Sequence, residues 1–181
     1  AGVGTHDLIY TFTSTQGCTV SDTAQVDVYA APVASLSLQS DTICLNESLI
    51  LTGGTPQGGT YFGTAVQGGA FDASVAGVGD HSIGYLYQDG NGCADTAYAT
   101  VHVDPLPVVT APPNDTICLS GGSIALSGGL PAGGFYNGNG VTTGLFDPAA
   151  VGAGTHQVKY TYTGANGCQN TVPLYIVVLA D

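Results

Sequence analysis

The sequence predicts an all-β protein made of tandem immunoglobulin-like antiparallel β-sandwich repeats of about 75 residues. The first observation is the repeat itself, because histidine at positions 6, 81 and 156 and cysteine at positions 18, 93 and 168 recur 75 residues apart. The second is that glycine and proline interrupt short apolar runs throughout, and no segment keeps the apolar spacing of an amphipathic helix. A period of this length indicates an array of small modules that are stabilised by their own cores and by their neighbours.

The period divides the chain of 181 residues into one incomplete and two complete repeats. We expect residues 1–32 to form the C-terminal part of an incomplete immunoglobulin-like repeat, and residues 33–106 and 107–181 to form one complete repeat each. The linkers at 30–33 and 104–108 are short and contain proline, which favours a semi-rigid, extended string of domains.

Several short strands open each complete repeat, separated by Gly-Gly turns and followed by a Phe-Asp pair and a stretch of small residues. Together with the final hairpin they amount to about six or seven strands per repeat, which is typical of a sandwich of two sheets. The expected short strands lie near 33–38, 48–52 and 60–62 in one repeat and near 107–110, 123–127 and 134–136 in the other.

The last two strands of each repeat form the clearest hairpin. From the repeated histidine, apolar residues alternate with polar or small ones, which indicates a strand with one buried face. An Asn-Gly turn before the cysteine supports the hairpin, and the next strand alternates in the same way. The inner faces are expected to include His81, Ile83, Tyr85 and Tyr87, and then Cys93, Ala97, Ala99, Val101 and Val103, with the equivalent residues in the following repeat.

Residues 1–32 supply only this hairpin, and a hairpin alone is marginally stable in water. Something is therefore expected to complete it. Two explanations stay open: the missing strands precede it in a longer repeat protein, or a neighbouring subunit donates them in trans.

The five cysteines indicate disulfides rather than a metal or thioredoxin-like site, because the chain has no CxxC pair. Cys44 and Cys93 lie 49 residues apart in one repeat, and Cys118 and Cys168 lie 50 apart in the next. We expect one bond within each repeat, tying its entrance to its final hairpin, while Cys18 is unpaired or bonded to a partner outside the chain. Disulfides indicate an extracellular or periplasmic setting, and the predicted location of the chain is extracellular or at the cell surface.

The charge balance excludes several classes of partner. Thirteen acidic residues face a single base, Lys159, yet charged residues make up only 8% of the chain. Nucleic acid and anionic membrane surfaces require clustered lysine and arginine, so neither is an expected partner. No apolar stretch is long enough for membrane insertion. So few charges favour either a coat of glycans or burial of the surfaces in an assembly.

No residue is predicted to be catalytic or to bind a metal, no cofactor is expected, and the chain is predicted not to be an enzyme. The repeated histidines begin inward-facing series, so a packing role or a hydrogen bond at the strand end is expected, while His102 is expected to be solvated. Asp72 and Asp147 recur in the Phe-Asp pairs, where hydrogen bonding to a turn is favoured over calcium binding. Serine is common, but no nucleophile motif such as GxSxG is present.

Two long segments, GGTYFGTAVQGGAFDASVAGVGDHSIGYLYQDGNGC and GGFYNGNGVTTGLFDPAAVGAGTHQVKYTYTGANGC, carry a resemblance to a known family. They resemble the Ig-like repeat modules of giant secreted surface and adhesin proteins of Bacteroidota, which often carry a gliding-motility-type C-terminal sorting domain. The most specific elements are the FDPxxxGxGxH/Y segment, the YxYT strand and the NGC turn. The resemblance implies β-sandwich modules of a surface fibre or adhesin.

The same resemblance implies a second feature, because Bacteroidota attach O-glycans to Asp-Ser/Thr followed by a small or aliphatic residue. Strand alternation places Thr23 and Thr96 on the outward face, as a glycan requires. The other interpretation is that Asp-Thr simply suits turns and strand starts. The candidate positions for O-glycosylation are Thr23, Thr42, Thr96 and Thr116.

The predicted function is that of a non-catalytic structural repeat module in an extracellular filament or fibrous cell-surface adhesin, a secreted glycoprotein whose partners are copies of itself or adjacent repeats, and glycans. The alternative is a carbohydrate- or surface-binding accessory module of a secreted multidomain protein, which presents aromatic residues such as Tyr61 and Phe62. A secreted hydrolase would need chemistry from residues that this chain lacks.

Overall fold

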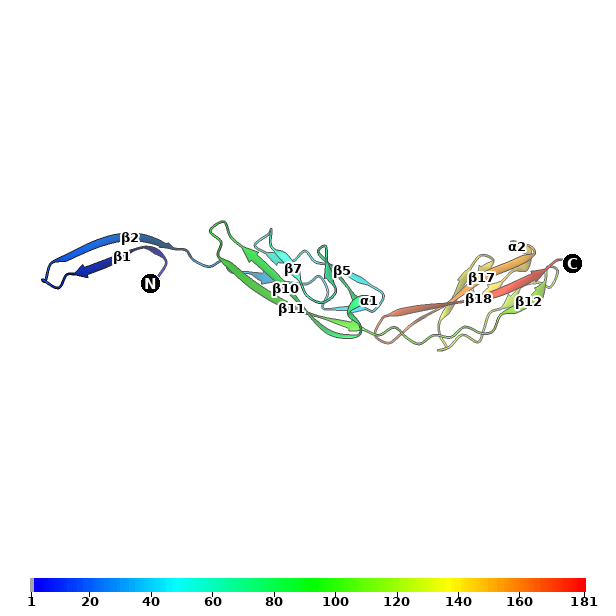
Figure 1. Ribbon diagram of the computed structural model, residues 1–181. Coiled ribbons are helices and arrows are strands. Elements are labelled where there is room, and N and C mark those ends of the chain that lie inside the picture. The colour runs from blue at the N-terminus through cyan, green and yellow to red at the C-terminus, as the bar shows by residue number, and fades with distance from the viewer. Residues whose placement is uncertain (1) are drawn as a thin grey trace. The chain divides into compact units, whose positions relative to one another are not determined.

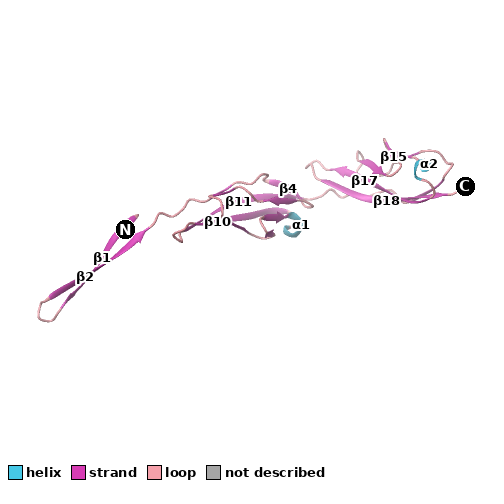
Figure 2. Cartoon of the chain, turned by 90° about the horizontal axis from the view of Figure 1, so that it is seen from above, coloured by secondary structure: helices cyan, strands magenta, loops and turns pink. Residues whose placement is uncertain are grey.

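The computed structural model of the protein describes residues 2–181 and consists of strands joined by short turns (Figure 2). Helix is limited in these residues to two single turns, α1 (Ala73–Ala76) and α2 (Pro148–Val151). The predicted all-β, immunoglobulin-like fold class is confirmed. The chain divides into two compact units, which are described separately. Unit 1 comprises the chain up to Asp41 with Ser48–Ala76 and Asp80–His102, and unit 2 comprises Thr42–Glu47, Gly77–Gly79 and Val103–Asp181.

The first two strands form an isolated hairpin, drawn in blue in Figure 1. Strand β1 (Gly4–Thr13) pairs antiparallel with β2 (Thr19–Val28), with Gly4 opposite Val28 and Thr13 opposite Thr19. Its apolar residues correspond by the 75-residue period to the buried faces of the complete repeats. Here they stay exposed, at 59% for Leu8, 70% for Tyr10 and 55% for Phe12. The hairpin thus has the alternation of a buried strand pair, but no other part of the described residues covers its apolar face.

Three sheets form the repeat in residues 33–106 (Figure 1). Its four-stranded sheet has the order β4-β11-β10-β7, and the smaller sheets have the orders β5-β9-β8 and β3-β6. The strands are β3 (Ser35–Leu36), β4 (Thr42–Cys44), β5 (Ser48–Ile50), β6 (Gly54–Thr55), β7 (Thr60–Phe62), β8 (Val66–Gln67), β9 (Ala70–Asp72), β10 (Gly79–Gln88) and β11 (Ala94–Asp104).

Unit 2 repeats this architecture. Its four-stranded sheet has the order β12-β18-β17-β14, and its second sheet has the order β13-β16-β15. Unlike the antiparallel pairs, β12 runs parallel to β18, with Asp115 opposite Ile176 and Cys118 opposite Leu179. The strands are β12 (Asp115–Cys118), β13 (Ile124–Ala125), β14 (Phe135–Gly138), β15 (Val141–Thr142), β16 (Leu145–Phe146), β17 (Gly154–Thr163) and β18 (Gln169–Leu179).

In the two complete repeats, the period-two pattern correctly predicts the apolar residues that the long strands bury. In β10 and β11, Ile83, Tyr85, Val101 and Val103 are at most 1% exposed. In unit 2 the core is formed by residues from the neighbouring strands β17 and β18 of one sheet and from β16 of the other. These core residues are Phe146, Val158, Leu174, Ile176 and Val178.

In each complete repeat, the strand that contains the repeated histidine (β10 or β17) also carries a tyrosine that fixes a turn. This turn is the Gly-Gly turn just before β7 or β14. In unit 2 the Tyr160 hydroxyl donates to the carbonyl of Pro131 (2.5 Å) and accepts from the amide of Gly134 (2.9 Å). A Cβ on Gly134 would lie 2.5 Å from the ring of Tyr160, so the backbone approach requires glycine. Tyr85 makes the same two bonds with Pro56 and Gly59.

Candidate functional site

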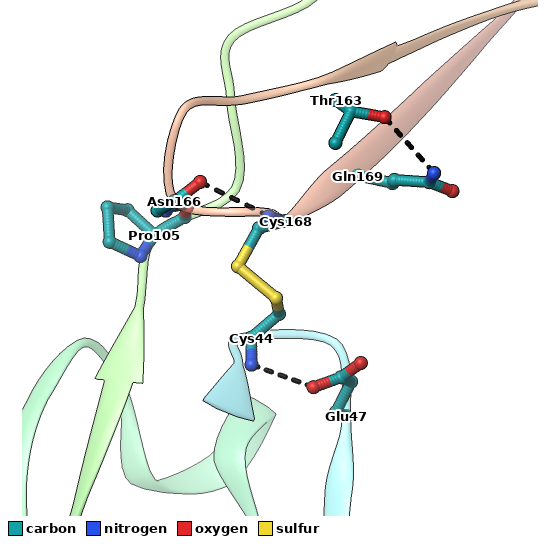
Figure 3. The surroundings of a disulfide bond; sticks show 7 residues. All are labelled: Cys44, Glu47, Pro105, Thr163, Asn166, Cys168 and Gln169. Atoms are coloured by element: carbon teal, nitrogen blue, oxygen red, sulfur yellow. Dashed lines mark hydrogen bonds between the residues drawn. A yellow bond between two sulfur atoms is a disulfide. The ribbon is translucent and has the colours of Figure 1, made fainter. Parts of the chain in front are cut away.

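The one disulfide among the described residues joins the two complete sequence repeats (Figure 3). Cys44 ends β4 and Cys168 immediately precedes β18, and their Cα atoms are 5.6 Å apart. Both residues lie in unit 2, because Thr42–Glu47 clusters with that unit although it belongs to the preceding sequence repeat. The bond therefore crosses the repeat boundary, with a sequence separation of 124.

The prediction that Cys44 bonds Cys93 and that Cys118 bonds Cys168 is wrong, and the parallel register of β12 gives the reason. Cys118 lies opposite Leu179 at the far end of β18, whereas Cys168 precedes the first residue of that strand of 11 residues. A strand of this length puts the two cysteines roughly 33 Å apart, far beyond the Cα separation of about 4.4 to 6.8 Å that a disulfide requires.

The repeat in residues 33–106 has the same register. The amide of Leu45, next to Cys44, donates to the carbonyl of Asp104 at the end of β11, whereas Cys93 precedes the start of that strand. Cysteine spacing alone could not reveal this, because a bond within a repeat and a bond to the next repeat use the same repeated positions. The structure leaves Cys18, Cys93 and Cys118 as free thiols, with Cys18 and Cys118 exposed and Cys93 half-buried.

The turn before Cys168 is fixed by hydrogen bonds on both sides. Within the turn, the amide of Gly164 donates to the carbonyl of Cys168 (2.8 Å), and the Asn166 side chain accepts from the Cys168 amide (3.2 Å; Figure 3). Toward the linker, the Asn166 side-chain amide donates to the carbonyl of Pro105 (3.0 Å), and that of Asn170 donates to the carbonyl of Pro107 (2.9 Å). The hairpin thus holds the proline-bearing segment that leads into its own repeat.

The backbone around Cys44 is equally well defined. Its amide donates to the Glu47 carboxylate (2.9 Å), and its carbonyl accepts from the Glu47 amide (2.9 Å), so that β4 ends in a tight turn (Figure 3). The preceding residue, Ile43, is only 8% exposed, which anchors the strand in a core. The Cys44 half of the disulfide thus comes from a hydrogen-bonded strand end.

The repeated histidines lie at strand starts, in agreement with the role expected from the sequence. Nε2 of His156 lies 2.9 Å from the carbonyl of Gly152, and that of His6 lies 2.6 Å from the carbonyl of Gly2. The rings of His81 and Phe71 also pack at 5.6 Å. His102 is exposed, as expected, and its Nδ1 also lies 2.5 Å from a carboxylate oxygen of Asp80.

The recurring aspartates act as turn caps. Asp147 accepts from the amide of Ala149 (3.0 Å) at the start of α2, and Asp72 accepts from both the amide and the hydroxyl of Ser74 (2.9 and 2.7 Å). The Ser74 hydroxyl bond is the main cause that lowers the pKa of Asp72. Within residues 2–181, no group of three or more His, Cys, Asp or Glu side chains could hold a metal ion, and no helix there is long and apolar enough to cross a membrane.

The Asp-Thr candidates for O-glycosylation differ in accessibility. Thr23, Thr42 and Thr116 are exposed, whereas Thr96 is half-buried. Asp22 accepts from the amide of Thr23 (2.9 Å), and Asp115 from that of Thr116 (2.8 Å), so these carboxylates also order the backbone. Glycosylation at these threonines stays a prediction.

The aromatic residues that suggested a binding surface have different roles. Tyr61 packs against Tyr85, with ring centroids 4.8 Å apart, and its hydroxyl accepts from the amide of Gly54 (2.8 Å). Tyr61 therefore helps to hold the turn that Tyr85 fixes, rather than forming a binding surface. Phe62 is 39% exposed, and its ring lies 6.0 Å from that of Tyr98, which is 65% exposed. The sequence did not single out Tyr98, because nothing in its strand pattern distinguishes it from other outward residues.

No family model matches the chain, and no curated protein matches its sequence. Among solved structures, the chain is similar to a Ca²⁺-stabilised adhesin with which an Antarctic bacterium binds ice, with 17% identity, a TM-score of 0.35, and coverage of 98% of this chain and 57% of that one. It is also similar to SGBP-B of the Bacteroides ovatus mixed-linkage glucan utilization locus, with 15% identity, a TM-score of 0.25, and coverage of 98% and 53%. The chain thus spans little more than half the length of either structure, and similarity at this level carries no argument about function.

Proposed function

We propose that the chain is a non-catalytic structural repeat module of a secreted extracellular filament or fibrous cell-surface adhesin. The observation that carries this proposal is the disulfide between Cys44 and Cys168, which joins one sequence repeat to the next. A bond of this kind transmits tension between modules without depending on the linker alone.

Two further observations support this proposal. The same tyrosine hydrogen bonds to a Gly-Gly turn and the same capping aspartate occur in both complete repeats, and the repeated histidines and aspartates make structural hydrogen bonds. The charge is also low for a surface of this size, at 8% charged residues, which suits surfaces that are covered by neighbours or by glycans at Thr23, Thr42 and Thr116. The sequence resemblance to Bacteroidota surface proteins agrees with this function.

Electron microscopy of the native protein tests the proposal. We expect thin fibres or strings with a regular axial repeat, because modules joined at both ends form an open array. Compact, monodisperse particles without fibres would contradict it. Mass spectrometry of the same material would report glycans on the exposed threonines as a separate result.

A second candidate function, binding of carbohydrate, is favoured by the exposed pair Phe62 and Tyr98. An aromatic platform of this kind is absent from the other complete repeat, where Asn137 and Pro173 occupy the equivalent positions, so it is not required by the fold. A glycan array should then give a signal that Tyr98→Ala abolishes and Tyr175→Ala keeps. Equal signals from both variants would exclude the platform as the binding surface.

A further inference from the structure

The two free cysteines of the complete repeats, Cys93 and Cys118, occupy the same structural positions as the two cysteines of the observed disulfide. We define the strand-end cysteines as Cys44 and Cys118, and the hairpin cysteines as Cys18, Cys93 and Cys168. The observed bond joins one member of each class, and it joins the strand end of one repeat to the hairpin of the next.

Backbone hydrogen bonds show that the strand-end positions are equivalent. The amide of Leu119 donates to the carbonyl of Leu179 (2.9 Å), as that of Leu45 donates to Asp104 (3.0 Å). The amide three residues after each cysteine returns to its carbonyl at 2.9 Å, from Glu47 in one repeat and from Gly121 in the other. Cys118 is therefore held in the same turn as Cys44, but its side chain is exposed.

The hairpin positions are equivalent as well. The residue four positions before each cysteine donates its amide to the cysteine carbonyl, at 2.8 Å for Cys18, 2.9 Å for Cys93 and 2.8 Å for Cys168. Each cysteine amide also donates to a side chain of the turn, which is Ser14, Asp89 or Asn166. The difference lies in burial, since Cys168 is fully buried within the bonded pair, whereas Cys18 is exposed and Cys93 half-buried.

We propose that Cys118 and Cys93 are covalent docking sites for further copies of this repeat. In this assignment Cys118 bonds the hairpin cysteine of a following copy, and Cys93 bonds the strand-end cysteine of a preceding copy. Every internal repeat of an array then has two disulfides to its neighbours and none within itself. This inference deepens the proposed structural function and rests on it, because it requires that repeats lie next to repeats.

The reaction is an ordinary thiol-disulfide exchange with a low-molecular-weight or protein disulfide as the oxidant. The thiolate of one cysteine attacks a sulfur of the oxidant and releases one thiol, which gives a mixed disulfide. The thiolate of the partner cysteine then displaces the second oxidant thiol and forms the bond between repeats. The two protein thiols together lose two electrons and two protons, and the oxidant is reduced to two thiols.

The decisive experiment is disulfide mapping of the native protein after alkylation of free thiols. We expect Cys118 to be linked to a peptide that contains the Gly-Cys of a hairpin turn, and Cys93 to a peptide that contains a strand-end cysteine. Comparing molecular mass with and without reduction shows whether the partner copy belongs to the same polypeptide or to another. Alkylated Cys93 and Cys118, or bonds within a repeat, would overturn the proposal.

A second experiment tests the rule that a strand-end cysteine bonds a hairpin cysteine of another copy. The chain is oxidised with glutathione disulfide. We expect covalent oligomers in which Cys118 is linked to Cys18 or Cys93 of a second copy, and loss of these oligomers in Cys118→Ser. The matched variant Cys93→Ser keeps a free hairpin thiol at Cys18 and should retain them. Oligomers that persist in Cys118→Ser, or no oligomers from the wild-type chain, would overturn the rule. Fibres seen by microscopy without these bonds would leave the proposed function intact while refuting this inference.

Discussion

Tyr85 and Tyr160 are the residues that most directly connect the repeated sequence to the repeated fold. Each is at most 2% exposed, and each phenol hydroxyl makes two hydrogen bonds to the backbone of a Gly-Gly-containing turn. A hydroxyl that both donates and accepts can satisfy a carbonyl and an amide of the turn at once. The turn, which has no regular ladder of its own, is thereby fixed to the sheet.

Removing the hydroxyl in Tyr160→Phe leaves the Pro131 carbonyl and the Gly134 amide without this partner. We expect a loss of about 1 to 3 kcal/mol in the free energy of unfolding, because two partly buried hydrogen bonds are lost and each contributes about 0.5 to 1.5 kcal/mol. Urea unfolding followed by far-UV circular dichroism measures it. Tyr175→Phe is the matched control, because that side chain is 40% exposed, and its effect should be close to zero. Equal effects of both changes would argue against the turn-fixing role.

Glycine at the same turn is required for a steric reason. A Cβ on Gly59 would lie 2.4 Å from the carbonyl oxygen of Leu86 and 2.5 Å from the ring of Tyr85. Gly59→Ala is therefore expected to lower the free energy of unfolding by about 1 to 3 kcal/mol through overpacking. The same measurement on Gly90→Ala should show little change, since nothing lies within 4 Å of a Cβ there. If Gly59→Ala were as stable as the wild type, the close approach would be disproved.

At the scale of elements, the short strands that carry the strand-end cysteines decide the disulfide pattern. The long hairpin strands could be predicted with their buried faces, since alternation specifies both the period and the face. Strands β4 and β12 have only three and four residues, too few for any periodic signal. Their pairing and direction depend on tertiary contacts, so the sequence located the cysteines but could not locate their partners.

The single helical turns after the Phe-Asp pairs could not be predicted from the sequence for a similar reason. A four-residue turn such as α2 has no apolar periodicity, but it has a start signal, with Asp147 as the N-cap and Pro148 in the first turn. The sequence identified Asp147 as a turn-capping residue and missed the helix that it caps. Local chemistry was thus predictable where the extended element was not.

Asp95 lies in β11, in the final hairpin of residues 33–106, and connects this hairpin to the segment at the start of the same repeat. Its carboxylate accepts from the amide of Ala34 (2.8 Å), and the bonds from the Ala34 and Thr96 amides lower its pKa below the ordinary value of 3.8. A group whose pKa is lowered by folding stabilises the folded state above its unfolded pKa. This contribution is lost as the pH falls through the lowered, folded value.

The variant Asp95→Asn isolates this contribution, because asparagine occupies the equivalent position 170 of the next repeat and is compatible with the fold. We expect the wild type to be more stable than the variant between pH 5 and pH 8, about where the carboxylate is fully ionised. The difference should shrink below about pH 4 and vanish in stronger acid. Urea unfolding of both proteins across this range measures it, and a difference that is independent of pH would refute the assignment.

At the scale of the whole molecule, the boundaries of the 75-residue sequence repeat differ from those of the compact unit that contains the disulfide. The sequence repeat ends near residue 106, but the segment Thr42–Glu47 clusters with unit 2 and is bonded there through Cys44. Unit 2 therefore includes residues of the preceding sequence repeat. In the fibre that we propose, such a bond would connect successive repeats covalently in addition to the linker.

The contribution of this bond can be measured with alanine at either end. The disulfide closes a sequence separation of 124 residues, for which chain entropy predicts a stabilisation of about 5 kcal/mol. Cys44→Ala and Cys168→Ala should each lower the free energy of unfolding of unit 2 by a large part of this amount. The double variant should lose hardly more free energy of unfolding than the less stable single variant, because both changes remove the same bond.

The free, exposed Cys18 provides the control, since Cys18→Ala is expected to stay within about 0.5 kcal/mol of the wild type. Additive losses in the double variant, or unchanged unfolding in the single ones, would show that the two repeats are not held together by this bond.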